Sequence, residues 1–329
     1  MTAKRSVFAL VAFGLMVLAN AFPAGAAMVS LAFDDGLDGT YDFAYPILKK
    51  YGVPGVSGIV TSRIDPAHEE FMNWEQIDKL AAAGWEIASH SVNHVRPIDV
   101  PVFLSQEPIK DWIKFGSNPA IYHAPYDYVI ATGLFENGRP LKEVADVKEL
   151  KSTPGTYFFD RFIQTLQVRP FNPPEYPSQL DIRAFSYERE MEQSKKDLAE
   201  HGIDVKTYIP PFNYWTGEVK TASARFYQNA LTGEGVGNRP TAFDRFAIKR
   251  YMVHSKDTVA SLIRIVKENA VDKDSWVIFC LHSVGDTYGW EPWDADKLDR
   301  FVSWLKQEGI DIVTISDGVE RMRKLSPAN

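Results

Sequence analysis

The sequence predicts an α/β fold, a parallel sheet or barrel made of βα units and interrupted by one large insertion. Short apolar runs rich in strand-forming residues alternate with segments of helical period. One long stretch follows neither period. The chain has 329 residues, 45% of them hydrophobic and 24% charged, which suits one large globular domain or two small ones.

The predicted strands are short apolar runs with β-branched or aromatic residues. In chain order they cover residues 29–33, 56–61, 85–89, 206–209, 248–253, 276–281 and 311–315. The predicted helices lie between them and carry apolar residues at helical spacing. They cover residues 43–50, 75–83, 187–201, 258–269 and 295–307. This alternation is typical of parallel strands joined by helices.

The segment 99–183 breaks the alternation, because it is rich in proline and aromatic residues and has no clean period. A structureless loop of this length is unusual in a compact domain. We therefore expect an insertion or cap that divides the barrel sequence into residues 28–98 and 184–325. Its aromatic side chains are expected to form a small core of its own rather than to stack on a bound ligand: Tyr122, Tyr126, Tyr128, Tyr157, Phe158 and Phe159.

Residues 1–27 have the three parts of a secretory signal peptide. Lys4 and Arg5 precede an apolar run over residues 7–19, and small residues follow at 24–26. The apolar run is short for a bilayer span, although an uncleaved anchor is the alternative. The segment predicts export to the periplasm or the medium, with no membrane attachment after cleavage.

The net charge of −7 argues against nucleic acid or anionic lipid as the main partner. Removing the signal peptide makes the charge more negative, because that segment has two basic residues and no acid. Cys280 is the only cysteine, so no intramolecular disulfide is possible, and its apolar surroundings favour a buried thiol. No protein partner is implied.

Polar residues follow four of the predicted strands, where parallel α/β folds build their sites. These strand ends are Asp34-Asp35-Gly36, His90-Ser91-Val92-Asn93-His94, Pro210-Pro211-Phe212 and Leu281-His282. Each alone has an ordinary structural explanation, such as a turn or a strand stop. Together they favour a site, because two imidazoles and a carboxylate can hold a metal ion with one open position. A second carboxylate and a further histidine then supply base and acid.

The same strand ends resemble the motifs of the polysaccharide deacetylases of carbohydrate esterase family 4, the NodB-homology family. Residues 32–36, Ala-Phe-Asp-Asp-Gly, resemble the first motif, and residues 90–94 match the second, His-Ser/Thr-x-x-His. The approach through residues 72–75 and 84–90 is similar too. The resemblance covers about 28–98 and 185–320 and leaves the insertion unexplained.

The resemblance implies a distorted (β/α)₇ TIM-like barrel with the insertion after its third strand. It implies Asp34 as the general base and His282 as the general acid. Asp35, His90 and His94 would hold a divalent metal ion, with zinc expected. Pro210, Pro211 and Phe212 would line the acetyl pocket. Proline lacks an N–H, so Phe212 carries the first backbone donor after the pair, suited to the oxyanion.

Two features depart from the family pattern. Ile209 stands where the family's third motif commonly has an arginine that pairs with the catalytic carboxylate. Either another arginine reaches Asp34, or its pKa is set differently, or activity is reduced. The aspartate that orients the acid histidine has two candidates, Asp257 and Asp286.

The leading hypothesis is removal of acetyl groups from a polysaccharide, with N-deacetylation of an N-acetylhexosamine polymer expected. O-deacetylation of an acetylated polysaccharide is the close alternative, because its chemistry is nearly the same. A non-catalytic sugar-binding protein on the same barrel is the third. The missing arginine favours it, while Asp34 argues against it, because a binding protein needs no base beside the metal.

Overall fold

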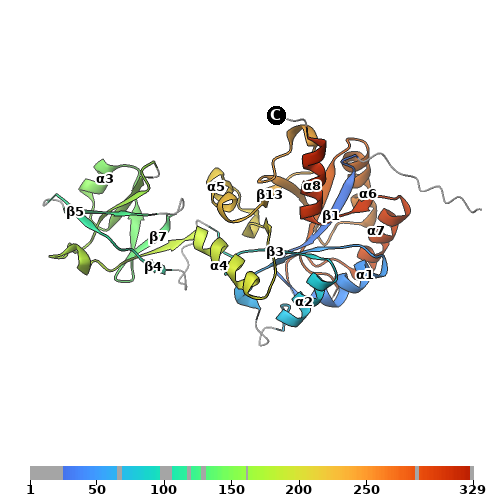
Figure 1. Cartoon of the computed structure of the whole chain (residues 1–329), viewed down its shortest axis with the longest axis horizontal. Helices are drawn as coiled ribbons and strands as arrows, with labels where there is room; N and C mark the ends of the chain where they lie inside the picture. The colour runs from blue at the N-terminus through green and yellow to red at the C-terminus, as the bar shows by residue number, and fades with distance from the viewer. Residues whose placement is uncertain are drawn as a thin grey trace, which may run out of the picture.

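The computed structural model describes residues 25–64, 69–96, 106–116, 120–126, 131–160, 162–285 and 289–326. It consists of a parallel barrel surrounded by helices and a separate β-rich lobe beside it (Figure 1). Most of the predicted signal peptide lies outside the described residues. Within the described residues, no helix has the length and apolar character needed to cross a membrane.

The barrel contains seven parallel strands in the order β15-β14-β13-β12-β3-β2-β1, and it closes because β1 also pairs with β15. Their bounds are β1 Met28–Phe33, β2 Val56–Ile59, β3 Glu86–Ser89, β12 Thr207–Tyr208, β13 Asn229–Glu234, β14 Ile248–Met252 and β15 Trp276–Leu281. Strand β16, Asp311–Ile312, adds to the start of β1. The predicted distorted barrel with an insertion after its third strand is confirmed.

The barrel helices are α1 Tyr45–Lys50, α2 Trp74–Ala82, α4 Tyr187–Glu200, α5 Gly217–Phe226, α6 Val259–Ile265, α7 Ala295–Gln307 and α8 Ile315–Leu325. Side-chain caps start several of them, as at α2, where Asn73 accepts from the backbone of Gln76 and Gln76 reciprocates. Every residue of β1 and of β15 is buried, so these two strands run through the core.

Four elements of the barrel are absent from the sequence prediction or differ from it. Strand β13 was not predicted, because its sequence Asn-Ala-Leu-Thr-Gly-Glu is poor in strand formers. Helices α5 and α8 were also not predicted. The strand predicted over 311–315 ends at Ile312, because the Thr314 hydroxyl accepts from Asp317 N at 3.1 Å and starts α8 at Ile315.

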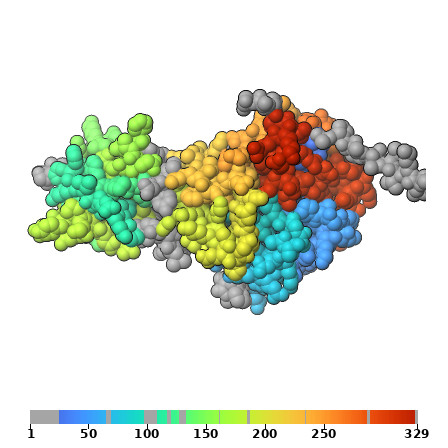
Figure 2. Space-filling view, viewed as in Figure 1, coloured from blue at the N-terminus to red at the C-terminus, as the bar shows by residue number. Residues whose placement is uncertain are grey.

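The inserted lobe is a second sheet in the order β4-β11-β7-β8-β9-β10-β6-β5. Its elements are β4 Gln106–Pro108, β5 Ile113–Phe115, β6 Ile121–Pro125, β7 Ala131–Glu136, β8 Arg139–Glu143, α3 Val147–Ser152, β9 Thr156–Asp160, β10 Thr165–Arg169 and β11 Ile182–Ser186. Figure 2 shows it as a lobe distinct from the barrel. Tyr122, Tyr126, Tyr157 and Phe159 lie in its core, which confirms the core interpretation for these four. Phe158 packs partly buried on a smaller cluster, and Tyr128 lies outside the described residues.

The lobe returns to the barrel without a linker, because β11 ends at Ser186 and α4 begins at Tyr187. The Tyr187 hydroxyl is buried and hydrogen-bonds the hydroxyl of Tyr208 in β12 at 2.7 Å. Helix α4 therefore joins the insertion to the barrel wall beside the second strand-end motif.

Candidate active site

Asp34 and Asp35 both face the cavity because the chain turns sharply after β1. Neighbouring residues of an extended strand would point to opposite sides. Here Asp34 still donates its backbone N–H to Leu281 O at 2.9 Å, while Asp35 and Gly36 both have φ of 73°. This left-handed turn, rare for a residue with a side chain, brings both carboxylates to one site.

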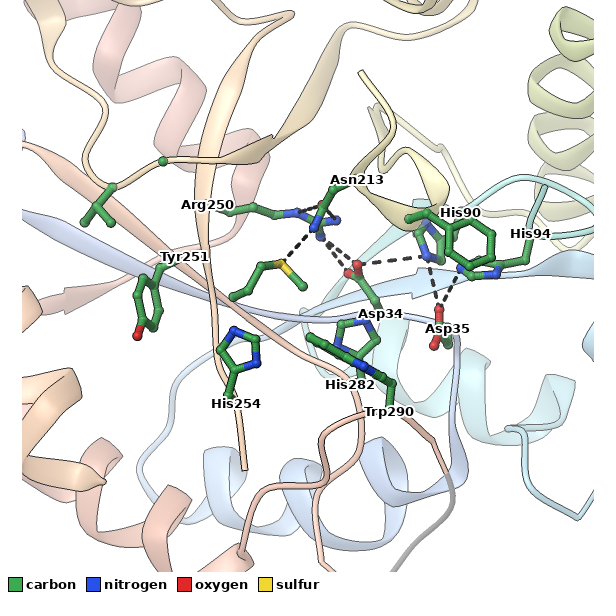
Figure 3. Close-up of a pocket in the computed structure, with 14 residues that line it drawn as sticks. Asp34, Asp35, His90, His94, Asn213, Arg250, Tyr251, His254, His282 and Trp290 are labelled. Carbon is green, nitrogen blue, oxygen red and sulfur yellow. Dashed lines mark hydrogen bonds and ion pairs between the residues drawn. The ribbon is translucent and has the colours of Figure 1, made fainter. Parts of the chain in front are cut away.

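Asp35, His90 and His94 form a cluster suited to a divalent metal ion (Figure 3). One carboxylate oxygen of Asp35, Oδ1, lies 3.2 Å from Nε2 of His90 and 3.2 Å from Nε2 of His94. That oxygen is buried and has no hydrogen-bond partner among the described residues. Ligands 2.0–2.2 Å from a tetrahedral zinc stand about 3.3–3.6 Å apart. The three ligand atoms here lie within 4.8 Å of one another, so the side chains suit such an ion.

The orientation of His90 also suits a metal ligand. Its Nδ1 lies 2.8 Å from the carbonyl oxygen of Ile209 and is set to donate to it. The hydrogen then sits on Nδ1, which leaves the Nε2 lone pair directed at the cluster. A metal ion bound by these three side chains requires an ionised Asp35 carboxylate and neutral imidazoles.

Arg250 pairs with Asp34 inside the barrel. Its Nη1 lies 2.7 Å from Oδ2 and 2.9 Å from Oδ1 of Asp34, and the two side chains are 1% and 2% exposed. Burial alone would raise the pKa of Asp34, but Arg250 and His90 lower it below its usual value. Of the three explanations that the Ile209 departure left open, the first is correct: another arginine reaches the carboxylate. Ile209 contributes its carbonyl to His90 and its side chain to an apolar cluster.

Arg250 also holds the segment that follows β12. Its Nε and Nη2 donate to Asn213 Oδ1 at 3.1 and 2.5 Å. The ring of Phe212 is 60% exposed and lies 4.4 Å from the ring of His94. Among the described residues, Phe212 lines the cavity, whereas Pro210 and Pro211 are buried and do not.

Sequence reasoning missed Arg250 and Asn213, because neither belongs to a strand-end motif. The sequence did contain one indication that Arg250 is buried. Residues 248, 250 and 252 lie on one side of a predicted strand, and Ile248 and Met252 make that side apolar. An arginine between them has to be buried, and a buried arginine requires an anionic partner.

His282 follows β15 and lies close to Asp34 in the cavity (Figure 3). Burial lowers its pKa below the usual value, although Asp34 and Asp35 act in the opposite direction. Its Nδ1 has no hydrogen-bond partner among the described residues, and the Trp290 ring packs edge-on against it at 4.9 Å. Of the two aspartates considered for orienting His282, Asp257 accepts a hydrogen bond from the backbone N–H of His254 at 2.9 Å. Asp286 lies outside the described residues.

These groups surround a cavity of about 650 Å³. It is lined by Asp34, Asp35, His90, His94, Phe212, Asn213, Gly235, Val236, Arg250, Tyr251, Met252, His254, His282 and Trp290. The structure thus brings the predicted base, acid and metal-binding residues into one cavity. Such an arrangement is typical of a metal-dependent hydrolase.

Comparison with known proteins agrees with this class. Residues 23–122 match the model of the polysaccharide deacetylase family. A putative polysaccharide deacetylase of Bacillus subtilis (strain 168), YxkH, is 36% identical over 67 residues, which is 20% of this chain and 23% of the relative. The chain is therefore similar to polysaccharide deacetylases over part of its length. The match spans under a quarter of the length of that relative.

Several solved structures are similar to this chain over most of its length. The peptidoglycan deacetylase PdaC from Bacillus subtilis has a TM-score of 0.46 and 14% identity, covering 92% of this chain and 95% of that one. A family 4 acetyl xylan esterase from Clostridium thermocellum, in complex with cobalt, has a TM-score of 0.45 and 14% identity, covering 91% of this chain and 92% of that one. A pseudoenzyme of carbohydrate esterase family 4 from Bacillus anthracis has a TM-score of 0.44 and 11% identity, covering 90% of this chain and 66% of that one. At these TM-scores nothing about activity follows from the likeness.

Proposed function

We propose that this chain is an exported, zinc-dependent deacetylase that removes N-acetyl groups from a polymer of N-acetylhexosamine. The observation that carries the proposal is the position of Asp34. This carboxylate lies beside the Asp35–His90–His94 cluster and 3.9 Å from His90 Nε2, yet it is paired with Arg250. It is therefore held ionised next to the metal-binding cluster rather than used as one of its ligands.

The proposed reaction uses three sets of groups. A divalent ion held by Asp35, His90 and His94 would supply Lewis acidity at the acetyl carbonyl. Asp34 accepts the proton of the attacking water, and His282 donates a proton to the leaving nitrogen. Phe212 lies in the cavity wall, where its backbone N–H would stabilise the oxyanion.

The pairing of Asp34 with Arg250 weakens the case for a non-catalytic sugar-binding protein. That alternative depended on the missing arginine at position 209, and Arg250 supplies the missing charge from another strand. The O-deacetylase alternative stays open, because a metal ion, a base and an acid hydrolyse an ester as well as an amide.

The test is acetate release from N-acetylated and O-acetylated glycans, with and without a chelator. We expect release from an N-acetylhexosamine oligomer, loss with the chelator, and recovery on adding Zn²⁺. The Asp34→Asn variant serves as the matched control, since it should keep the metal and lose the activity. Release from O-acetylated glycans alone would support the esterase. Glycan binding without acetate release would support the non-catalytic alternative.

A further inference from the structure

The loop that carries both metal-binding histidines is strained in its backbone. Within residues 90–94, two non-glycine residues have their backbone in the left-handed region. Ser91 has φ of 67° and His94 has φ of 52°. Such conformations persist only where surrounding contacts hold them. One side of the loop is held by the barrel, because Thr61 N and Ser62 N donate to Ser91 O and Val92 O at 3.2 and 3.0 Å.

The other side of the loop is held by one buried carboxylate. Glu190 in α4 is fully buried. Its Oε2 accepts from Val92 N at 3.1 Å and from Asn93 N at 2.7 Å, and its Oε1 accepts from Asn93 Nδ2 at 2.7 Å. Val92 and Asn93 lie between the two histidines, so these three hydrogen bonds fix the part of the chain that sets their separation.

We propose that Glu190 is a positioning residue for the metal centre, holding the loop so that His90 and His94 present their Nε2 atoms to one ion. The inference depends on the metal site of the proposed function.

Metal affinity tests the proposal without depending on activity. Affinity for Zn²⁺ is measured by competition with a chelator, ligand geometry from the visible absorption of bound Co²⁺, and folding from thermal melting of the metal-free protein. Glu190→Gln has one carbonyl oxygen for three donors and should bind Zn²⁺ about 10-fold or more weakly, as for other groups that orient metal ligands. The Co²⁺ spectrum should change as well.

Glu188→Gln is the matched control. Glu188 is also fully buried in the same turn of α4, and it pairs with Arg225 at 2.7 Å. Its metal affinity should equal that of the wild type. Equal losses in both variants would mean a general disturbance of α4 and would overturn the proposal, as would unchanged affinity in Glu190→Gln.

Asn93→Ala provides a second variant should Glu190→Gln fail to fold. It removes one of the three hydrogen bonds and should weaken Zn²⁺ binding by a smaller factor, whereas wild-type affinity in a folded Asn93→Ala would then overturn the proposal. A wild-type protein that binds no divalent ion would instead refute the proposed function, so the two failures are distinguishable.

Discussion

Replacing Arg250 with methionine should destabilise the protein and change its pH dependence, because it leaves the buried Asp34 carboxylate without its counter-charge. At 2.7 Å and an effective dielectric constant near 20, the attraction between unit charges is about 6 kcal/mol. Removing one member of a buried pair typically costs about 3–5 kcal/mol. We expect Arg250→Met to lower the free energy of unfolding at pH 7 by about this amount.

The sign of the pH dependence follows from the direction of the shift. In the wild type the folded pKa of Asp34 is lowered. The stabilisation is therefore present above the unfolded value, about 3.9, and is lost as the pH falls through the folded value. In Arg250→Met the folded pKa of Asp34 should rise, because the counter-charge that lowers it is gone. The acid limb of kcat/KM should move to higher pH with it, and the deficit in stability should shrink at low pH.

Urea unfolding and pH–rate profiles measure both effects. Arg321→Met is the control, because Arg321 pairs with Asp311 at the same 2.7 Å distance, but their side chains are 31% and 59% exposed. A surface pair contributes about 1 kcal/mol or less. Adding Asp34→Asn to Arg250→Met should restore most of the lost stability. The reasoning would be refuted if Arg250→Met lost no more unfolding free energy than Arg321→Met and the acid limb of its kcat/KM profile stayed in place.

Three further predictions concern the other groups of the site. His94→Ala should lose most of the roughly one divalent ion per chain that an open three-ligand site implies, and wild-type metal content by elemental analysis would contradict the assignment. Asp34→Asn should keep the metal and lose about 10²-fold or more in rate; if instead Asp35→Asn keeps metal while Asp34→Asn loses it, the two roles are exchanged. His282→Ala should slow hydrolysis of an N-acetyl sugar about 10²–10⁴-fold while sparing an aryl acetate with an acidic phenol leaving group, and equal losses on both substrates would count against the acid role.

The barrel was predictable because its strands carry their signal locally. Residues 276–281, Trp-Val-Ile-Phe-Cys-Leu, form a continuous apolar run, and all of β15 is buried. Strand β13 was not predictable in this way, because Gly233 and Asn229 weaken the pattern and pairing with β12 and β14 determines its conformation. The sheet of the insertion was missed for a similar reason. Its strands are three to six residues long, too short for a clear period.

The candidate metal-binding cluster was predictable for a different reason. Asp35, His90 and His94 belong to short motifs in which the chemistry and the spacing coincide. The groups that support these three residues do not belong to such motifs. Arg250 is 216 residues from Asp34 along the chain, and Glu190 is 97 residues from Asn93. Only the closed barrel and the return of α4 bring these partners together, so no local pattern could pair them.

This difference bears on how the Ile209 departure is interpreted. The base role proposed for Asp34 is favoured by a nearby positive charge that keeps the carboxylate ionised, and any strand of the barrel can supply that charge. Arg250 reaches the carboxylate from β14 and at the same time holds Asn213, so the base and the segment carrying Phe212 depend on one guanidinium. Losing the arginine from one motif is therefore not evidence for an inactive site. The informative criterion is whether Asp34 keeps a charged partner in three dimensions, and here it does.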